Sequence, residues 1–98
     1  MAADFMMRQQ DIARVQLLTL MEEAFASELS FNETHRVQTR LADLLLSITD
    51  EYLYETGVIF RRWLDDWDIR QRDGDYAEST TSKLKDRYRV VLVAAEPH

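Results

Sequence analysis

The sequence predicts an all-α protein in which residues 1–98 form one domain, a small bundle of three to four helices. Only 2 glycines and 1 proline occur in the 98 residues, and the first 56 residues contain neither, so few residues interrupt helices. Hydrophobic residues make up 46% of the chain, and in the first half they recur every three or four positions, the period of a helix with one buried face. No cysteine is present, which excludes disulfides and thiolate metal ligands.

The first predicted helix spans residues 4–29. It begins with Asp4, a residue type that caps helix N-termini. Its apolar stripe consists of Phe5, Ile12, Val15, Leu18, Met21, Phe25 and Leu29, widened by Leu17, Leu20 and Ala24.

The second predicted helix spans residues 31–56. Ser30 and Glu33 have the spacing of a capping box, and Asn32 is a competing N-cap. The apolar residues on one side of this helix follow one another at intervals of four, three, four and four positions, which is the clearest pattern in the chain. It consists of Val37, Leu41, Leu44, Ile48 and Tyr52, with Leu45 and Leu53 beside them.

Helical composition continues beyond residue 56 as far as Arg72. An unbroken helix over these ~40 residues would be about 60 Å long, which is unusual in a small domain. Either the helix breaks near Gly57, or a second copy of the chain covers the excess length. We expect a break or kink near Gly57 and a third helix over residues 58–72, which Gly74 ends as a C-cap in the left-handed conformation.

The last segment fits two patterns. Residues 76–95 form an apolar helix face, but basic and other residues also alternate over residues 83–90, as in a strand. A single strand would leave its backbone groups unpaired unless two copies paired across a dimer axis. We therefore expect a helix, with Leu84, Tyr88, Val91, Leu92 and Ala95 on its apolar face.

The charge is acidic overall and is distributed unevenly. The chain has 18 acidic and 12 basic residues, which gives a net charge of −6, the wrong sign for general affinity to nucleic-acid backbones. Residues 1–57 carry 10 acidic and 4 basic residues, whereas residues 58–98 carry 8 of each. The acidic half could dock a basic partner or imitate a nucleic acid, but a solvated helix exterior is the favoured interpretation.

The chain is expected to be cytoplasmic. Its start lacks a basic segment followed by an apolar core, as in a secretion signal, and no uncharged apolar run approaches the ~20 residues of a membrane span. Self-association into a homodimer is also expected, since helices of about 25 residues with broad apolar stripes are long for a monomer of this size.

One segment has the composition of a protein-binding site. Trp and Arg are the residue types most enriched at binding hot spots, and two tryptophans four positions apart share a helix face. The predicted protein-binding residues are Phe60, Arg61, Arg62, Trp63 and Trp67. The alternative is that both indoles fill the core.

A second segment suggests contact with nucleic acid. Four basic residues and a tyrosine near the C-terminus could meet about four phosphates, and a dimer would double that number. These residues are Lys83, Lys85, Arg87, Tyr88 and Arg89. Solvated surface or ion pairing is the favoured alternative.

The sequence predicts no catalytic residue, metal ligand or cofactor. Asp65, Asp66 and Asp68 lack the register of a calcium loop, and we expect Asp65 and Asp68 to pair with Arg61, Arg62 and Arg72. A metal-dependent helical hydrolase is a weaker hypothesis, because the acidic residues of the second helix flank its apolar stripe. Motifs of serine nucleophiles, phosphate loops and dinucleotide sites are absent.

These patterns favour a small acidic protein that is not an enzyme. We expect an adaptor, inhibitor or regulatory subunit that acts by binding another protein. A nucleic-acid-associated regulator is the alternative.

Overall fold

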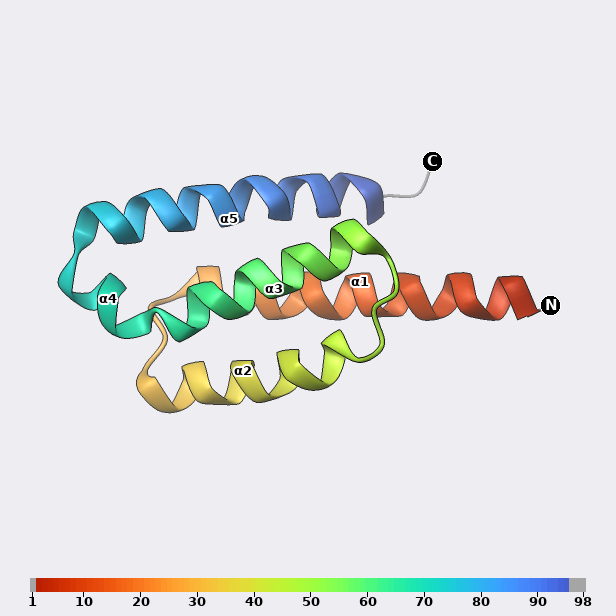
Figure 1. Ribbon diagram of the computed structural model, residues 1–98, viewed down its shortest axis with the longest axis horizontal. Helices are drawn as coiled ribbons and strands as arrows, with labels where there is room; N and C mark the ends of the chain where they lie inside the picture. Colours follow the sequence, from red (N-terminus) through yellow and green to blue (C-terminus); the bar gives the residue numbers. More distant parts are fainter. Residues whose placement is uncertain (1, 96–98) are drawn as a thin grey trace.

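The protein is a bundle of antiparallel helices. The computed structural model describes the backbone of residues 2–95 and the side chains of residues 10–94. Its helices are α1 (Ala2–Ala26), α2 (Phe31–Leu45), α3 (Glu51–Asp65), α4 (Trp67–Arg72) and α5 (Gly74–Ala95). The four long helices α1, α2, α3 and α5 alternate in direction, and the short α4 joins α3 to α5 at one end (Figure 1). The predicted all-α class is confirmed, with five helices in place of three to four.

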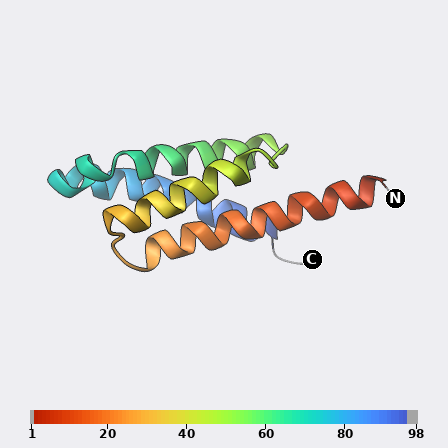
Figure 2. The same ribbon diagram turned by 90° about the horizontal axis from the view of Figure 1, so that it is seen from below.

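The four long helices form a closed ring. Each packs against two neighbours, in the order α1, α2, α3 and α5, and α5 returns to α1. Helix α1 is the longest, and its first turns extend beyond the ends of the other helices (Figure 2). No helix among residues 2–95 has a stretch long and apolar enough to cross a membrane.

Helix α1 buries a narrower face than the sequence predicts. Ile12 and Val15 were expected in the buried stripe but are 57% and 56% exposed. The apolar stripe is wider than the face that α2 and α5 cover, so one edge stays at the surface. Among residues 10–26 of α1, those that are buried are Ala13, Leu17, Leu18, Leu20, Met21 and Ala24.

The bounds of α1 also differ from the prediction. The helix begins at Ala2, so Asp4 is inside it and is not its N-cap, and the side chain of Phe5 lies outside the described residues. The helix ends at Ala26, and Leu29 is buried within the loop that follows.

Helix α2 begins where the sequence predicts. Ser30 is its N-cap, and the Ser30 Oγ accepts a hydrogen bond from the backbone N–H of Glu33 at 3.2 Å. The same hydroxyl donates to Glu33 Oε1 at 2.9 Å, which completes the pairing of these two residues. Such a cap stabilises a helix by about 1 kcal/mol.

The predicted helix over residues 31–56 is wrong, because the chain reverses at residues 46–50. Helix α2 ends at Leu45, and Asp50 caps α3 by accepting from the backbone N–H of Leu53 at 2.8 Å. Gln10 of α1 binds this reversal: its amide donates to the Ser47 carbonyl, and its carbonyl oxygen accepts from the N–H groups of Thr49 and Asp50. These bonds satisfy backbone groups that a continuous helix would have paired internally.

Gly57 does not break the helix. It lies inside α3 at the crossing with α2, where an added Cβ would be 2.5 Å from Leu45 Cδ2 and 3.9 Å from Leu41 Cδ1. The predicted break near Gly57 is therefore wrong. The glycine is used for close packing of two helices, a need that arises only in the tertiary structure.

The predicted helix over residues 58–72 is divided, and Gly74 does not end it. Helix α3 stops at Asp65, and α4 begins at Trp67. Gly74 is the first residue of α5 and has no positive φ, so the expected left-handed C-cap is wrong. Asp73 caps α5 instead, since its Oδ1 accepts from the N–H of Tyr76 at 3.0 Å.

Residues 74–95 form a helix, so the expectation for the last segment is confirmed and the strand alternative is wrong. Leu84 and Val91 are buried and Tyr88 is half-buried on the predicted face, whereas Leu92 is at the surface. The side chain of Ala95 lies outside the described residues.

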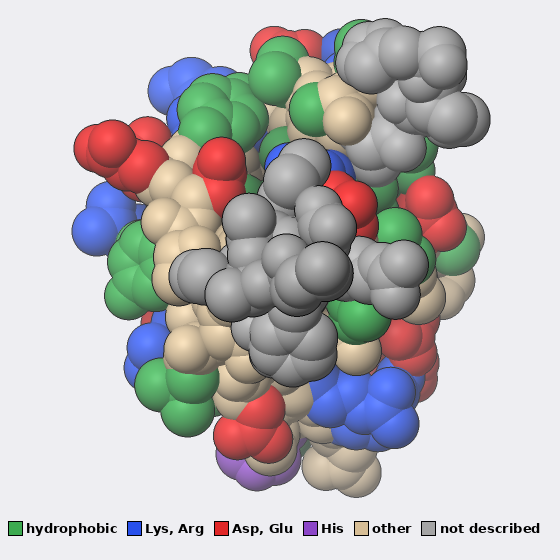
Figure 3. All heavy atoms as spheres, turned by 90° about the vertical axis from the view of Figure 1, so that its right-hand side faces the viewer, with side chains coloured by type: hydrophobic (Ala, Val, Ile, Leu, Met, Phe, Trp, Pro, Cys, Tyr) green, Lys and Arg blue, Asp and Glu red, His purple; other side chains and the backbone are tan. Residues whose placement is uncertain are grey.

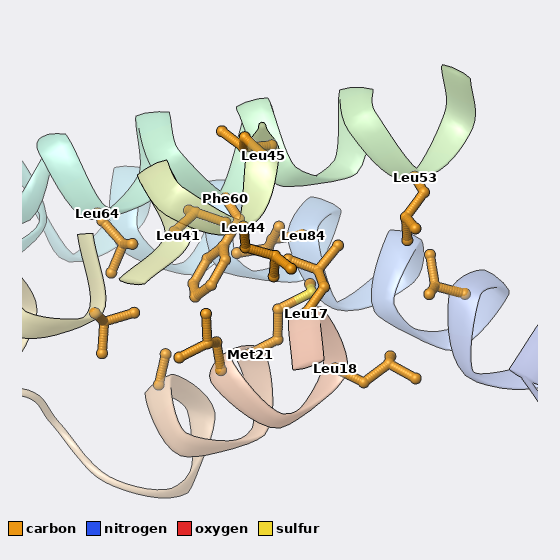
Figure 4. Close-up of a cluster of buried hydrophobic side chains, with 14 of the residues drawn as sticks. Leu17, Leu18, Met21, Leu41, Leu44, Leu45, Leu53, Phe60, Leu64 and Leu84 are labelled. Carbon is orange, nitrogen blue, oxygen red and sulfur yellow. The ribbon is translucent and has the colours of Figure 1, made fainter. Parts of the chain in front are cut away.

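The centre of the bundle is Phe60 of α3, which has 0% exposure. Its ring points between helices α1, α2 and α5, toward leucines and a methionine (Figure 4). The buried neighbours drawn around it are Leu17, Met21, Leu41, Leu44, Leu64 and Leu84. Leu64, one turn further along α3, is also fully buried, whereas Trp63 is half-buried at the edge of the core.

We predict that Gly57→Val lowers the free energy of unfolding by about 2 kcal/mol, because the new methyl groups would overlap the side chain of Leu45 in a packed core. Urea denaturation followed by circular dichroism measures the effect. Gly74→Ala is the control, since an added Cβ there meets no atom within 4 Å. Equal stability of the two variants would contradict the close approach of α2 and α3.

Candidate functional site

A pocket lies at the end of the bundle that contains α4. It has a volume of about 280 Å³ and is formed by the end of α1, the following loop, α3, α4 and the first half of α5. Its lining residues are Ala24, Phe25, Ser27, Glu28, Leu29, Trp63, Trp67, Arg70, Gln71, Ala77, Thr81 and Lys85. We call it the tryptophan pocket, because both tryptophans of the chain line it.

Trp63 is half-buried and forms one wall of the pocket. Its Nε1–H donates to the hydroxyl of Thr81 on α5 at 2.9 Å, which fixes the orientation of the indole. The ring also packs edge-on against Phe25 of α1, with centroids 6.0 Å apart. Trp63 thus joins three helices at the place where the core opens to the surface.

Trp67 is also half-buried and is held in a similar way. Its Nε1–H donates to the backbone carbonyl of Leu29 at 3.0 Å, which ties α4 to the loop between α1 and α2. The exposed ring of Phe31 packs edge-on against it at 6.0 Å. With both indole N–H groups already bonded, the indoles present mainly apolar ring surface to a ligand.

Arg70 of α4 covers Trp63. The centre of its guanidinium lies 3.7 Å from the centroid of the indole, a cation–π contact. Burial lowers the pKa of Arg70 relative to its ordinary value, although the carboxylate of Asp66 acts in the opposite direction. Among the described residues no ion pair or side-chain hydrogen bond of Arg70 is formed, and its Nη1 is buried without a partner.

Lys85 brings a second cation to the pocket. Its Nζ lies 5.5 Å from the ring centroid of Phe25 and forms no ion pair with a described residue. Glu28, on the opposite loop, is the one carboxylate among the residues that line the pocket. The pocket therefore has two positive groups and one negative group.

Asp66 acts on Arg70 through its charge but forms no ion pair with it, and its carboxylate is bonded to Tyr76. The Tyr76 hydroxyl donates to Asp66 Oδ2 at 2.6 Å, and this bond connects the start of α4 to the start of α5. Hydrogen bonding to Asp66 is the largest cause that raises the pKa of Tyr76 above 10.0. The bond keeps α4, and with it Trp67 and Arg70, in position over the pocket.

The structure separates the five predicted protein-binding residues. Trp63 and Trp67 line the tryptophan pocket, whereas Phe60 is in the core and has no surface to offer a partner. Arg61 and Arg62 are exposed on α3 and do not line the pocket. The alternative that the indoles fill the core holds only in part, because each keeps a face on the pocket.

Sequence reasoning did not place Arg70 or Phe25 at a binding site, and it assigned Lys85 to the nucleic-acid alternative. Arg70 follows Trp63 by seven positions and Trp67 by three, which is the spacing of one helix face, so this residue could have been found. Phe25 and Lys85 come from other helices. Their contribution depends on how α1 and α5 pack, which no local pattern shows.

The five predicted nucleic-acid-binding residues do not form one patch. On a helix they point to different sides: Lys85 and Tyr88 face α1, and the Tyr88 hydroxyl donates to Glu22 Oε1 at 2.7 Å. Arg87 faces α3, where it lies over Tyr52, donates to the Thr56 hydroxyl and lies 3.5 Å from a carboxylate oxygen of Glu55.

The other two members of that group are exposed. Arg89 forms an ion pair with Asp86 at 2.6 Å, and Lys83 points away from the bundle without an ion pair to a described residue. Lys83 and Arg87 are four positions apart, as are Lys85 and Arg89, so the basic charge of α5 is divided between two sides of the helix.

The aspartates near α4 are bound differently from the prediction. The predicted ion pairs with Arg61, Arg62 and Arg72 are wrong: Asp65 accepts from the Gln38 amide at 2.8 Å, and neither Asp65 nor Asp68 forms an ion pair with a described residue. Among the side chains of residues 10–94, no group of three acidic or histidine residues is placed to hold a metal ion.

Comparison of the chain with models of protein families, with curated proteins and with solved structures gave no match. The function must therefore be argued from the geometry of this molecule.

We predict that the free energy of unfolding falls at alkaline pH, because the hydroxyls of Tyr76 and Tyr88 each donate a hydrogen bond to a carboxylate. Each bond to a carboxylate raises the tyrosine pKa above 10.0, so each contribution is complete below pH 10.0 and is lost as the pH rises through the raised value. Urea denaturation at about pH 9 and about pH 11 measures the loss.

The double variant Tyr76→Phe, Tyr88→Phe should lose less stability over that interval, because it has no hydroxyl to ionise at either site. Tyr54→Phe is the matched control, as Tyr54 is exposed and donates no hydrogen bond to a described residue. A double variant with the same pH dependence as the control would contradict the role of these two bonds.

Proposed function

We propose that the protein is a non-catalytic binding protein, acting as an adaptor, inhibitor or regulatory subunit in the cytoplasm. Its partner is another protein, which inserts side chains into the tryptophan pocket. The observation that supports this proposal is the tryptophan pocket itself, in which two fixed indoles border a hollow of about 280 Å³.

The size and lining of the pocket favour a protein side chain over a cofactor. Sites for cofactors and drug-sized ligands usually have volumes of about 300–1,000 Å³, and this pocket lies just below that range. Tryptophan and arginine are the residues most often found at the energetic centres of protein interfaces. Because the two indoles are held by Thr81 and Leu29, a partner would not have to order them on binding.

We also propose that the protein forms a homodimer, through a different surface. A groove of about 480 Å³ runs between α1 and α2, and Val15, Leu20 and Leu44 are among its lining residues. Ile12 is exposed beside Val15 on α1, and Leu46, at the end of α2, is 88% exposed. At the end from which α1 projects, apolar side chains also reach the surface between charged ones (Figure 3).

A nucleic-acid-associated regulator is the less favoured alternative. Arg87 and Arg89 are already paired with Glu55 and Asp86, and the chain has a net charge of −6. A helical hydrolase gains no support from the described residues, since they form no metal-binding group.

The partner can be sought by an affinity pull-down from the native host's lysate, with elution by a salt gradient and mass spectrometry. We expect one stoichiometric protein that remains bound at physiological salt. Ala77→Gln should reduce its recovery about ten-fold, because a longer side chain occupies the pocket in place of the partner.

Ser79→Gln is the matched control on the same helix, since Ser79 is exposed and does not line the pocket. Equal recovery with both variants would contradict docking at the tryptophan pocket. Nucleic acid that elutes early in the salt gradient would favour the alternative function.

Light scattering of the purified protein should give twice the chain mass of 11.6 kDa. The variant Ile12→Arg, Val15→Arg should have the mass of one chain, because it places two charges on the proposed interface. Thr39→Arg, Ala42→Arg is the matched control, with the same spacing on the exposed side of α2, and should stay dimeric. A monomeric wild-type protein would contradict the proposed dimer.

A further inference from the structure

We infer that the tryptophan pocket is selective for a carboxylate: its ligand is a segment of the partner protein that places a large apolar side chain next to an acidic residue. This inference rests on the proposed function and specifies the chemistry of the partner. It is carried by charges at the pocket that the described part of the chain leaves unpaired.

Arg70 and Lys85 are the two cations of the pocket, and neither forms an ion pair with a described residue. Arg40, Arg61, Arg62 and Arg72 also form no ion pair with a described residue, but they are exposed. The other half-buried arginines, Arg14 and Arg87, are paired. Lys85 is exposed, but Arg70 is half-buried against Trp63. A half-buried guanidinium has already lost part of its hydration. Pairing it with a carboxylate of the partner therefore costs less further desolvation than pairing an exposed one.

Asp66, the residue before α4, acts on Arg70 through its charge but forms no ion pair with it. Its Oδ2 accepts the hydroxyl of Tyr76 at 2.6 Å, and Arg70 has no bonded counter-ion among the described residues. A partner's carboxylate in the pocket would be attracted by both Arg70 and Lys85, which is complementary in charge.

The apolar side chains that line the pocket determine which apolar group the ligand can place there. Trp63, Trp67 and Phe25 present ring surface, and Ala77 and Leu29 present aliphatic surface. A volume of about 280 Å³ accommodates one large side chain together with a neighbouring group. Because apolar side chains and unpaired cations line the same pocket, we expect the ligand to carry an apolar residue next to an acidic one.

The charge around the pocket disfavours a polyanion as its ligand. Glu28 also lines the pocket, and the whole chain carries a net charge of −6. A single carboxylate can approach the two cations, whereas a row of phosphates would also meet this acidic surface.

The test uses short synthetic peptides and the NMR signals of the two indole N–H groups. Both tryptophans of the chain line the pocket, so these two signals report on it directly. The probe is a blocked peptide of glycine and serine with Phe-Glu-Glu at its centre. Matched probes carry Phe-Gln-Gln, Phe-Lys-Lys or Gly-Glu-Glu instead.

We expect the Phe-Glu-Glu probe to shift both indole signals and to bind about three- to ten-fold more tightly than the Phe-Gln-Gln probe. This advantage should decrease between about 0.1 M and about 1 M salt, where the screening length falls from about 10 Å to about 3 Å. The Gly-Glu-Glu and Phe-Lys-Lys probes should bind least, because each lacks one half of the recognised pair.

Charge reversal on α5 provides a matched pair of variants. Lys85→Glu should remove the preference for Phe-Glu-Glu, whereas Lys83→Glu, on the opposite face of the same helix, should keep it. Arg70→Gln should also remove the preference, and the two indole signals of each free variant confirm that the pocket is still folded.

Two outcomes would overturn the inference. Equal binding of the Phe-Glu-Glu and Phe-Gln-Gln probes would show a pocket without charge selectivity. The absence of any indole shift at millimolar probe would show that such a segment is not a ligand. Neither outcome decides the proposed function, which depends on whether Ala77→Gln loses the partner that Ser79→Gln retains.

Discussion

The burial of Phe60 is the interaction on which the rest of the structure depends. Its ring occupies the space between four antiparallel helices, and each of these helices contributes apolar side chains to the same core. A bundle of this size has one core, so the loss of a central aromatic would leave a cavity that costs about 3–5 kcal/mol. The positions of α1, α2 and α5 around α3 follow from this packing.

The tryptophan pocket continues the aromatic part of the core. The ring of Trp63 lies 6.1 Å from that of Phe60, and Phe25 packs edge-on against both Trp63 and Tyr88. These contacts connect the centre of the bundle to its surface through a row of rings. The pocket is thus held by core packing as well as by hydrogen bonds, which limits the conformational entropy that a ligand would have to remove.

The short helix α4 completes the pocket with little apolar burial of its own. Its position depends on three polar contacts: Trp67 with the Leu29 carbonyl, Asp66 with Tyr76, and Arg70 with the face of Trp63. The side chain of Asp66 joins two helices through Tyr76, and Arg70 has no bonded counter-ion among the described residues. The contacts that hold α4 in place therefore also position Arg70, the residue that we propose to bind a carboxylate.

The sequence by itself determined the helical class, the start of α2 at the Ser30 cap, the helix over residues 74–95 and the presence of two tryptophans on neighbouring turns. These features follow from local spacing and from caps, which act within a few residues. The tertiary structure decided where the long second pattern stops, because the reversal at residues 46–50 is bound by Gln10 from another helix. It also decided that Gly57 packs against Leu45 and that Phe25 and Lys85 join Trp63 at one pocket. Such contacts join residues far apart in the chain, and no local pattern of residue types encodes them.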